Sequence, residues 1–373
     1  MGRITAACKV TTPSPDQNDL FGDAFEQGHG ARSQHATQPV APSAHPKRAN
    51  NNRGGLQLAE AAQQHADLAS RLSRAVHLGT SSWSYPGWVG QVWSEAFNER
   101  TLSRQGLVPY SAHPLMRTVS VDRALYQALS TGQYAGYAAQ VPDDFRFMVK
   151  APASVADALM RNEAGRNRGH NPYFLDPAMA EDSFIQPALQ GLKHKIGALV
   201  FQLAPLPDLW LRQPSRLLAQ LDRLLGALSP IKATAPDGVV ALEVRDAALV
   251  TPELADLLKA HGATYCLGLH ARMPPIEAQL PLLRRLWPGP LVCRWNLHRR
   301  HGTYGYEAAR AMYAPFNRLQ DEDQETRDVL AKVVRGTTQA GWPAYVSISN
   351  KAEGCAPLSV IKLAEAIVAS SAA

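Results

Sequence analysis

Short apolar runs alternate with amphipathic or Ala/Leu-rich segments along residues 76–370. Short apolar runs bounded by turn residues are typical of buried strands, whereas longer segments with a helical apolar period predict helices. The pattern predicts eight strands, at Val76–Thr80, Arg117–Asp122, Phe145–Lys150, Ala198–Leu203, Val239–Arg245, Ala263–Leu267, Leu291–Trp295 and Ala344–Ser349. It predicts helices between most of them, at residues 178–194, 214–228, 251–261, 276–286, 305–317, 322–340 and 356–370.

Strands that alternate with helices over about 300 residues favour an α/β protein, and specifically a TIM-like (β/α)8 barrel at residues 76–370. A doubly wound open sheet is the main alternative fold. It is disfavoured because neither GxGxxG nor GxxxxGKS/T follows an early strand, so a nucleotide-binding open sheet would lack its phosphate-binding loop.

Residues 1–70 differ in composition from the rest of the chain. The stretch Gln34–Gly55 is rich in Pro, Ala, His, Asn and Arg and has no apolar period. Such a segment buries too little apolar surface to offset its conformational entropy, so we expect a disordered N-terminal extension. A short helix at 56–74 fits the spacing of Leu58 and Ala62, which fall near one face.

The composition is that of a globular protein with a mild positive charge. The 373 residues carry a net charge of +6, which permits an anionic partner without requiring one. The four cysteines are scattered, with no CxxC pair or zinc-ligand spacing. The N-terminus lacks an apolar leader, and no apolar run reaches the ~18 residues of a membrane span. We therefore expect a cytoplasmic protein without membrane contact.

The predicted fifth strand carries the clearest chemical signal. Alternate residues of a strand share a face. One face carries Val240, Leu242 and Val244, which fit packing against helices. The other ends in Glu243 and Arg245, which fit the mouth of a pocket. Buried charges are costly unless they are paired or used. An ion pair that only plugs the barrel end is the structural alternative.

In a barrel of this kind, chemistry sits where the strands end and the βα loops begin. The same alternation places a set of polar side chains on the inward faces of the strands, concentrated near these ends. The set is Thr118, Ser120, Asp122, Arg146, Lys150, Gln202, Glu243, Arg245, Arg294 and Asn296, with Asn350 and Lys351 after the last strand.

The charges expected at this mouth indicate a small anionic ligand. Five members of the set are cationic and two are acidic, and guanidinium groups fork onto carboxylates and phosphates. Glu243 is predicted to be catalytic, as a general acid or base whose pKa is set by burial and Arg245. Lys150 is the second catalytic candidate, because a buried lysine among cations loses its proton more easily. The alternative for Lys150 is an ordinary contact to a phosphate or carboxylate.

The first βα loop carries Trp83, Tyr85 and Trp88. These aromatic side chains either form a stacking wall for a ring or sugar, or plug the barrel rim.

No metal site is predicted, and the sequence leaves the cofactor unknown. His298 and His301 have a metal-ligand spacing, but the neighbouring arginines would repel a cation. A metal held by Asp122, Glu243 and His270 is geometrically conceivable and stays an alternative.

Several motifs resemble those of a known family. Gly79–Tyr85, Asp144–Lys150, Phe201–Pro205, Glu243–Arg245 and Ser349–Gly354 occur in the order found in the YecE-like family, also called domain of unknown function 72. The resemblance covers residues 76–370 and implies a TIM-like barrel. It implies no reaction, because the family has no assigned activity.

The chain departs from the family pattern at several positions. Ser120 and Asp122 replace a Glu and an Asn of the second strand, although the family tyrosine is kept as Tyr126. Asp246 stands where the family has a histidine after the fifth-strand arginine, which disfavours a histidine-based mechanism. The predicted substrate-binding residues are Arg245, Arg294, Asn350, Lys351, Arg146, Asp122, Gln202, Trp83, Tyr85 and Tyr126.

A short peptide in the extension resembles the motif with which bacterial replication and repair proteins dock on the sliding clamp. Its key residues are Gln17, Asp19, Leu20 and Phe21. Leu20 and Phe21 would fill an apolar groove while Gln17 makes a hydrogen bond nearby. A chance match is the alternative.

Three functions are compatible with the sequence, and it does not decide whether the protein is an enzyme. The first is an enzyme that acts on a small anion. The second is a barrel linked to nucleic acid or repair and recruited to the clamp. The third is a ligand-binding barrel without catalysis.

Overall fold

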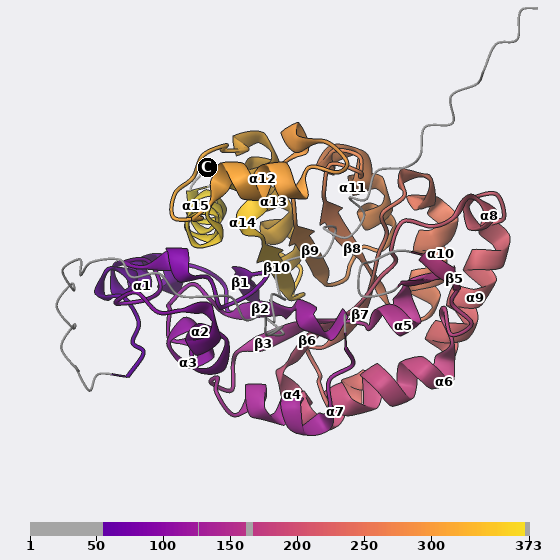
Figure 1. Cartoon of the computed structure of the whole chain (residues 1–373). Helices are drawn as coiled ribbons and strands as arrows, with labels where there is room; N and C mark the ends of the chain where they lie inside the picture. The colour runs from indigo at the N-terminus through magenta and orange to yellow at the C-terminus, as the bar shows by residue number, and fades with distance from the viewer. Residues whose placement is uncertain (1–54, 126, 162–166, 370–373) are drawn as a thin grey trace, which may run out of the picture.

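The computed structural model describes residues 55–125, 127–161 and 167–369 (Figure 1). Eight parallel strands close into a barrel in the order β1-β10-β9-β8-β7-β6-β3-β2. They are β1 Val76–Thr80, β2 Thr118–Val121, β3 Arg146–Lys150, β6 Ile196–Gln202, β7 Val239–Glu243, β8 Thr264–Leu269, β9 Leu291–Trp295 and β10 Ala344–Ile348. The predicted TIM-like barrel is confirmed, and each strand overlaps its predicted range.

Helices surround the barrel and cover its outer face (Figure 1). The α-helices are α1 Ala66–Ser70, α2 Glu99–Gln105, α3 Leu107–Ser111, α4 Thr131–Ala138, α5 Ala153–Ala156, α6 Pro177–Ala180, α7 Gln186–Leu192, α8 Asp208–Leu211, α9 Pro214–Ala227, α10 Pro252–Ala260, α11 Ile276–Arg285, α12 Tyr306–Tyr313, α13 Gln324–Gln339, α14 Asn350–Glu353 and α15 Ala356–Ala369. No described helix is both long and apolar enough to cross a membrane.

Six α-helices, namely α2, α3, α4, α5, α8 and α14, and one hairpin lie where the apolar pattern predicts none. Two of the helices, α2 and α4, bury only Leu102 and Tyr134, so no apolar period marks them. The hairpin pairs β4 Leu159–Arg161 with β5 Asn167–His170 outside the barrel. Every residue of β5 is exposed, so the sequence has no apolar alternation there that would predict a strand.

Local signals set the ends of α10 as the sequence indicates. The Thr251 side chain accepts a hydrogen bond from the Leu254 amide, and Pro252 occupies the first helical turn. After the helix, Gly262 adopts φ +63°, a left-handed conformation that glycine adopts without steric cost. These local interactions set the start and the end of the helix that connects β7 to β8.

The strands separate two hydrophobic clusters. The inner cluster fills the barrel and consists of Met148, Ala198, Val200, Val239, Ala241, Cys266, Val292 and Tyr345. The outer cluster packs the barrel against the helices and includes Phe147, Leu199, Leu242 and Val244. The faces predicted for the fifth strand are therefore confirmed, with Leu242 outward and Ala241 inward.

The described part of the N-terminal region packs on the barrel domain. Ala59, Ala62 and Leu72 are buried, and the Ser94 amide donates to the Gln57 carbonyl. This segment contains a 3₁₀-helix at Glu60–His65, followed by α1, within the range where one short helix is predicted.

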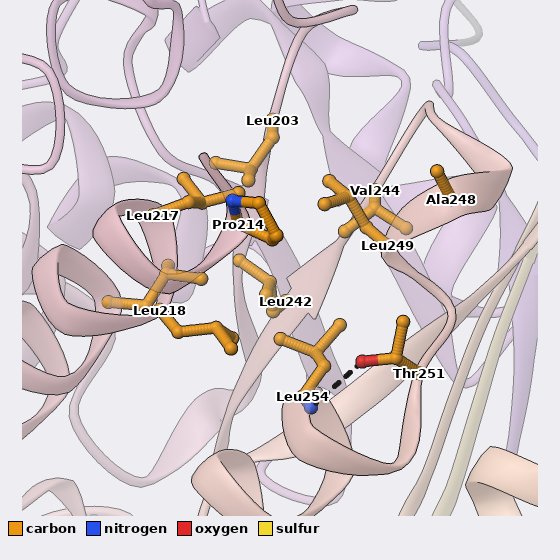
Figure 2. Close-up of a pocket in the computed structure, with 11 residues that line it drawn as sticks. Leu203, Pro214, Leu217, Leu218, Leu242, Val244, Ala248, Leu249, Thr251 and Leu254 are labelled. Carbon is orange, nitrogen blue, oxygen red and sulfur yellow. Dashed lines mark hydrogen bonds between the residues drawn. The ribbon is translucent and has the colours of Figure 1, made fainter. Parts of the chain in front are cut away.

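A small apolar cavity lies outside the barrel, between β6, β7 and the helices α9 and α10 (Figure 2). Its volume is about 30 Å³, which is room for one or two water molecules. Leu242 and Val244 line it, whereas Glu243 and Arg245 lie on the opposite face of the same strand. Because its lining is almost entirely apolar and it has room for only one or two water molecules, this cavity is a packing defect and not a binding site for a polar ligand.

We predict that Leu242→Ala lowers the free energy of unfolding by about 2–5 kcal/mol, because it removes buried apolar surface and enlarges the existing cavity. Val240→Ala is the matched control. Val240 lies on the same face but is only half-buried, so its truncation should cost about 1 kcal/mol. Denaturant unfolding of both variants tests this, and equal losses would contradict the assigned packing.

Candidate functional site

The centre of the barrel mouth is the carboxylate of Glu243, the last residue of β7. Its side chain is fully buried. One oxygen, Oε1, accepts from Arg245 Nη2 at 2.7 Å and from Asn296 Nδ2 at 3.3 Å. The other, Oε2, accepts from Arg294 Nη1 at 2.7 Å. Glu243 therefore joins two guanidinium groups that come from different strands.

The Arg294 guanidinium extends this network across the barrel. Its Nη1 also donates to Gln202 Oε1 at 3.0 Å, and its Nη2 donates to Asp122 Oδ2 at 2.6 Å. Ser120 donates to the other Asp122 oxygen at 2.5 Å. Arg294 is 1% exposed and Glu243 is fully buried, so the ion pair between them lies in a region of low dielectric, where it is stronger than at the surface. The Asp122 side chain is 33% exposed, so solvent screens its ion pair with Arg294 more strongly.

Both carboxylates of the network are ionised. Burial alone would raise the pKa of Glu243, but the charges of Arg245 and Arg294 outweigh it and hold the pKa below its ordinary value. The pKa of Asp122 is lowered in the same way, since Arg294 and Lys150 outweigh the effect of burial. Because both Glu243 oxygens are occupied, the geometry favours a role in positioning the arginines over the predicted role of acid or base.

Lys150 ends β3 beside this network. Its Nζ lies 4.0 Å from Asp122 Oδ2, and the side chain is buried. Burial lowers the pKa of Lys150 to about 8, with Asp122 and Glu243 raising it and Arg294 and Arg245 lowering it further. A lysine with this pKa is partly uncharged near neutral pH, which suits proton transfer or nucleophilic chemistry.

Four buried N–H groups at the barrel mouth have no hydrogen-bond partner among the described residues. They are Arg245 Nη1, His270 Nε2, Arg294 Nε and Asn350 Nδ2. His270 follows β8, and its Nδ1 accepts from the Arg272 amide, so Nε2 carries the hydrogen. Burial and then Arg245 lower the pKa of His270 to about 2, so its ring is neutral. We call these groups the open donors.

The residues after β10 frame the other side of the mouth. Asn350 Oδ1 accepts from Trp88 Nε1 at 3.1 Å and from the Ala356 amide at 2.9 Å, which fixes the side-chain amide. Lys351 is buried, and its Nζ lies 5.7 Å from the Tyr306 ring centre and 5.9 Å from that of Phe316.

The two aromatic residues of the first βα loop that are predicted to contact substrate have different environments. Trp83 is buried in the outer cluster, where its ring meets Tyr137 edge-on and its Nε1 donates to Ser103. It therefore packs the rim. Tyr85 is half-buried and packs against Trp88 and Phe316.

The structure corrects the placement of Arg146, which lies at the opposite end of the barrel. Arg146 is the first residue of β3, and its Nη2 pairs with Asp237 Oδ2 at 2.8 Å just before β7. The alternation of side chains predicts correctly which residues of β3 point into the barrel, but it does not say at which end of the barrel each one lies. Lys150 lies four residues further along β3, at the other end of the strand.

Two predictions lie outside the described residues. These are the substrate contact at Tyr126 and the clamp-binding peptide at Gln17–Phe21. The peptide stays a prediction.

Sequence reasoning missed two contributors to the mouth. Tyr306 begins α12 and lies against His270, with ring centres 5.3 Å apart. His270 was considered only as a metal ligand. Their position in the sequence could have identified them. His270 directly follows one predicted strand and Tyr306 lies in the segment after another, so both belong to βα connections, where the active sites of such barrels lie.

Among the described residues, no three His, Cys, Asp or Glu side chains are grouped so that they could hold a metal ion. Arg294 lies between Asp122 and Glu243 and bonds to both, which places a cation where a metal would bridge them. His301 bonds to the Tyr313 hydroxyl. Because Arg294 already pairs with both carboxylates, this arrangement disfavours a metal ion held between Asp122 and Glu243.

Comparison with known proteins gives a family and a fold. A family model described as "Protein of unknown function DUF72" matches residues 77–373. The chain is similar to a DUF72 family protein from Enterococcus faecalis, with 14% identity and a TM-score of 0.52 over 78% of this chain and 95% of that one. It is also similar to one from Thermotoga maritima, with 19% identity and a TM-score of 0.51 over 78% and 98%. Among curated proteins, no relative was found.

We predict that Glu243→Gln lowers the free energy of unfolding by about 3–5 kcal/mol at neutral pH, because it leaves two buried guanidinium groups without their shared charge. The folded-state pKa of Glu243 is lowered, so its stabilisation is present above the unfolded pKa of ~4.3 and is lost as the pH falls below it. The difference from wild type should therefore shrink in acid.

The matched control is Glu365→Gln, which removes an exposed partner of Lys362 and should change stability by less than about 1 kcal/mol. Urea unfolding over a range of pH measures both variants. A Glu243→Gln effect that is absent at neutral pH, or that does not depend on pH, would refute the ionised network.

Proposed function

This chain belongs to the DUF72 family, and we propose that it is an enzyme that binds a small anionic substrate at the C-terminal mouth of its barrel. One observation supports this most directly. The open donors are buried N–H groups that lack acceptors, and a buried donor without an acceptor is destabilising. A carboxylate or phosphate group supplies several acceptors at once and bears the charge that the arginines favour.

The arginines and Asn350 have binding roles in this proposal. Arg245 uses Nη2 to hold Glu243 and keeps Nη1 for the ligand, while Asn350 offers Nδ2 because its oxygen is already occupied. Glu243 and Asp122 fix the guanidinium groups before the ligand arrives. Such pre-organisation lowers the reorganisation cost of binding and of stabilising a developing negative charge.

Lys150 carries the proton transfer in this proposal. Its pKa of about 8 keeps both protonation states available near neutral pH, as general acid–base catalysis requires. In its neutral form Nζ takes a proton from the bound substrate. The ammonium so formed is stabilised by Asp122, which lies 4.0 Å away.

The charges around the mouth support a small anion over a polyanion such as nucleic acid. Three arginines of the surrounding loops already have carboxylate partners: Arg161 pairs with Asp157, Arg272 with Asp246, and Arg300 with Asp321. These pairs leave less positive potential at the rim for a long chain of phosphates.

We predict that the protein binds sulfate in a saturable manner and that Asn350→Asp weakens this binding about tenfold or more. The substitution keeps the shape and the acceptors for Trp88 and Ala356 but replaces the open donor with a negative charge. Isothermal titration measures the affinity.

Asn98→Asp is the matched control, because Asn98 caps α2 at an exposed site and aspartate caps equally well. Its sulfate affinity should equal that of wild type. No saturable binding by wild type, or equal affinity for wild type and Asn350→Asp, would contradict the proposed site.

We further predict that sulfate affinity falls as the pH rises through about 8. Sulfate remains a dianion over this range, so the change reports a protein group. Lys150 is charged below its pKa and attracts the anion, but is neutral above it. Titrations from pH 6.5 to 9.5 should show a loss of about tenfold, and Lys150→Met should abolish the pH dependence. A flat profile for wild type would exclude this role of Lys150.

A further inference from the structure

The segment between β9 and α13 forms a cap with its own small hydrophobic cluster. Leu297, Ala309, Tyr313 and Phe316 make up this cluster, which is separate from the two clusters of the barrel. Residues from other βα loops pack against it, including Tyr85 after β1 and Ala271 after β8. The cap, residues 297–323, thus spans loops on different sides of the mouth.

The cap is tied to the turn after β10, which carries the binding residues. The His298 amide donates to the Lys351 carbonyl at 2.9 Å, and the Gln320 amide donates to the Glu353 carbonyl at 2.8 Å. The fully buried Glu353 carboxylate also accepts from the Asp323 amide at 2.8 Å. Both ends of the cap are therefore held against α14, which fixes where α12 lies.

Tyr306, the first residue of α12, is the cap residue that lies against His270 and Lys351 at the barrel mouth. Its ring is tilted by 36° against that of His270, with 5.3 Å between the ring centres, and the Lys351 ammonium lies on the ring at 5.7 Å. Burial raises the pKa of Tyr306 to about 12, and the charges of Arg245, Arg294, Glu243 and Asp122 act on its hydroxyl. The hydroxyl is thus protonated at neutral pH, and the electric field of the charged groups at the barrel mouth acts on it.

The Tyr306 hydroxyl differs from those of four tyrosines that pack elsewhere in the domain, although the buried Tyr134 hydroxyl in α4 is also without a partner among the described residues. Tyr110, Tyr265, Tyr313 and Tyr345 all donate hydrogen bonds to protein acceptors. No hydrogen bond from the Tyr306 hydroxyl to another described residue is present, although its side chain is half-buried and its ring lies against His270, which carries one of the open donors. A half-buried hydroxyl next to an anion site without its own acceptor is suited to a ligand.

We propose that Tyr306 is a further substrate-contacting residue, whose hydroxyl donates a hydrogen bond to the bound anion from the cap side. The inference rests on the proposed function and extends it. The arginines, His270 and Asn350 bind the anion from the barrel, and Tyr306 closes the site from above. Because Tyr306 reaches the mouth through the cap, the position of α12 determines how completely the anion is enclosed.

The test compares Tyr306→Phe with Tyr304→Phe in the full-length protein, using sulfate as the probe. Tyr304 is two residues away and is 63% exposed, so it is a matched control for the loss of one hydroxyl. A hydrogen bond to a charged ligand predicts a loss of affinity of about tenfold in Tyr306→Phe. Tyr304→Phe should bind as wild type does.

A second readout is the ultraviolet difference spectrum of tyrosine on adding sulfate. Wild type and Tyr304→Phe should show a saturable change that follows the binding curve, and Tyr306→Phe should lose it. If wild type binds sulfate and Tyr306→Phe binds it equally well, or if both variants lose affinity alike, the inference is overturned while the proposed anion site stands. If wild type binds no sulfate, the proposed function itself fails.

Discussion

The structure of the barrel mouth depends on one buried carboxylate that binds two guanidinium groups. A charge moved out of water is tolerated only if partners in the protein replace its hydration. Glu243 has those partners in Arg245 and Arg294. Arg294 is buried as well, and its remaining N–H groups donate to Gln202 and Asp122. Once these groups satisfy one another, the positions of the remaining N–H groups are fixed. The geometry of the proposed anion site is thus a consequence of how the protein neutralises its own buried charge.

Closure of the barrel brings these groups together from distant parts of the chain. Asp122, Lys150, Glu243 and Arg294 belong to the ends of β2, β3, β7 and β9, and they meet only because parallel strands present their C-terminal ends at one face. The small inner residues below them, such as Ala198 and Ala241, leave the long charged side chains room in the mouth. The hydrophobic layers thereby determine where the polar network lies.

Short apolar runs in the sequence were sufficient to predict the eight strands and, with the helical segments between them, the barrel. The alternation of side chains along each strand then predicted the inward direction of Glu243, Arg245 and Arg294. It did not predict depth along a strand, and Arg146 was misplaced for that reason. Tyr306 was missed because a helical residue has no period-two signal, and its approach to the mouth depends on the cap packing. The roles of individual groups depend on which atoms the protein already uses. The sequence predicts that Glu243 acts as a general acid or base, but in the fold both of its carboxylate oxygens already accept hydrogen bonds from protein groups.

The central claim is that a pre-formed network leaves Arg245, His270 and Asn350 ready for an anion. A crystal structure grown with sulfate at neutral pH tests it most directly. The account predicts a sulfate with oxygens at about 2.7–3.2 Å from Arg245 Nη1, His270 Nε2 and Asn350 Nδ2, while Glu243 still binds both arginines. A mouth without sulfate, or a sulfate that takes Arg245 away from Glu243, would contradict it.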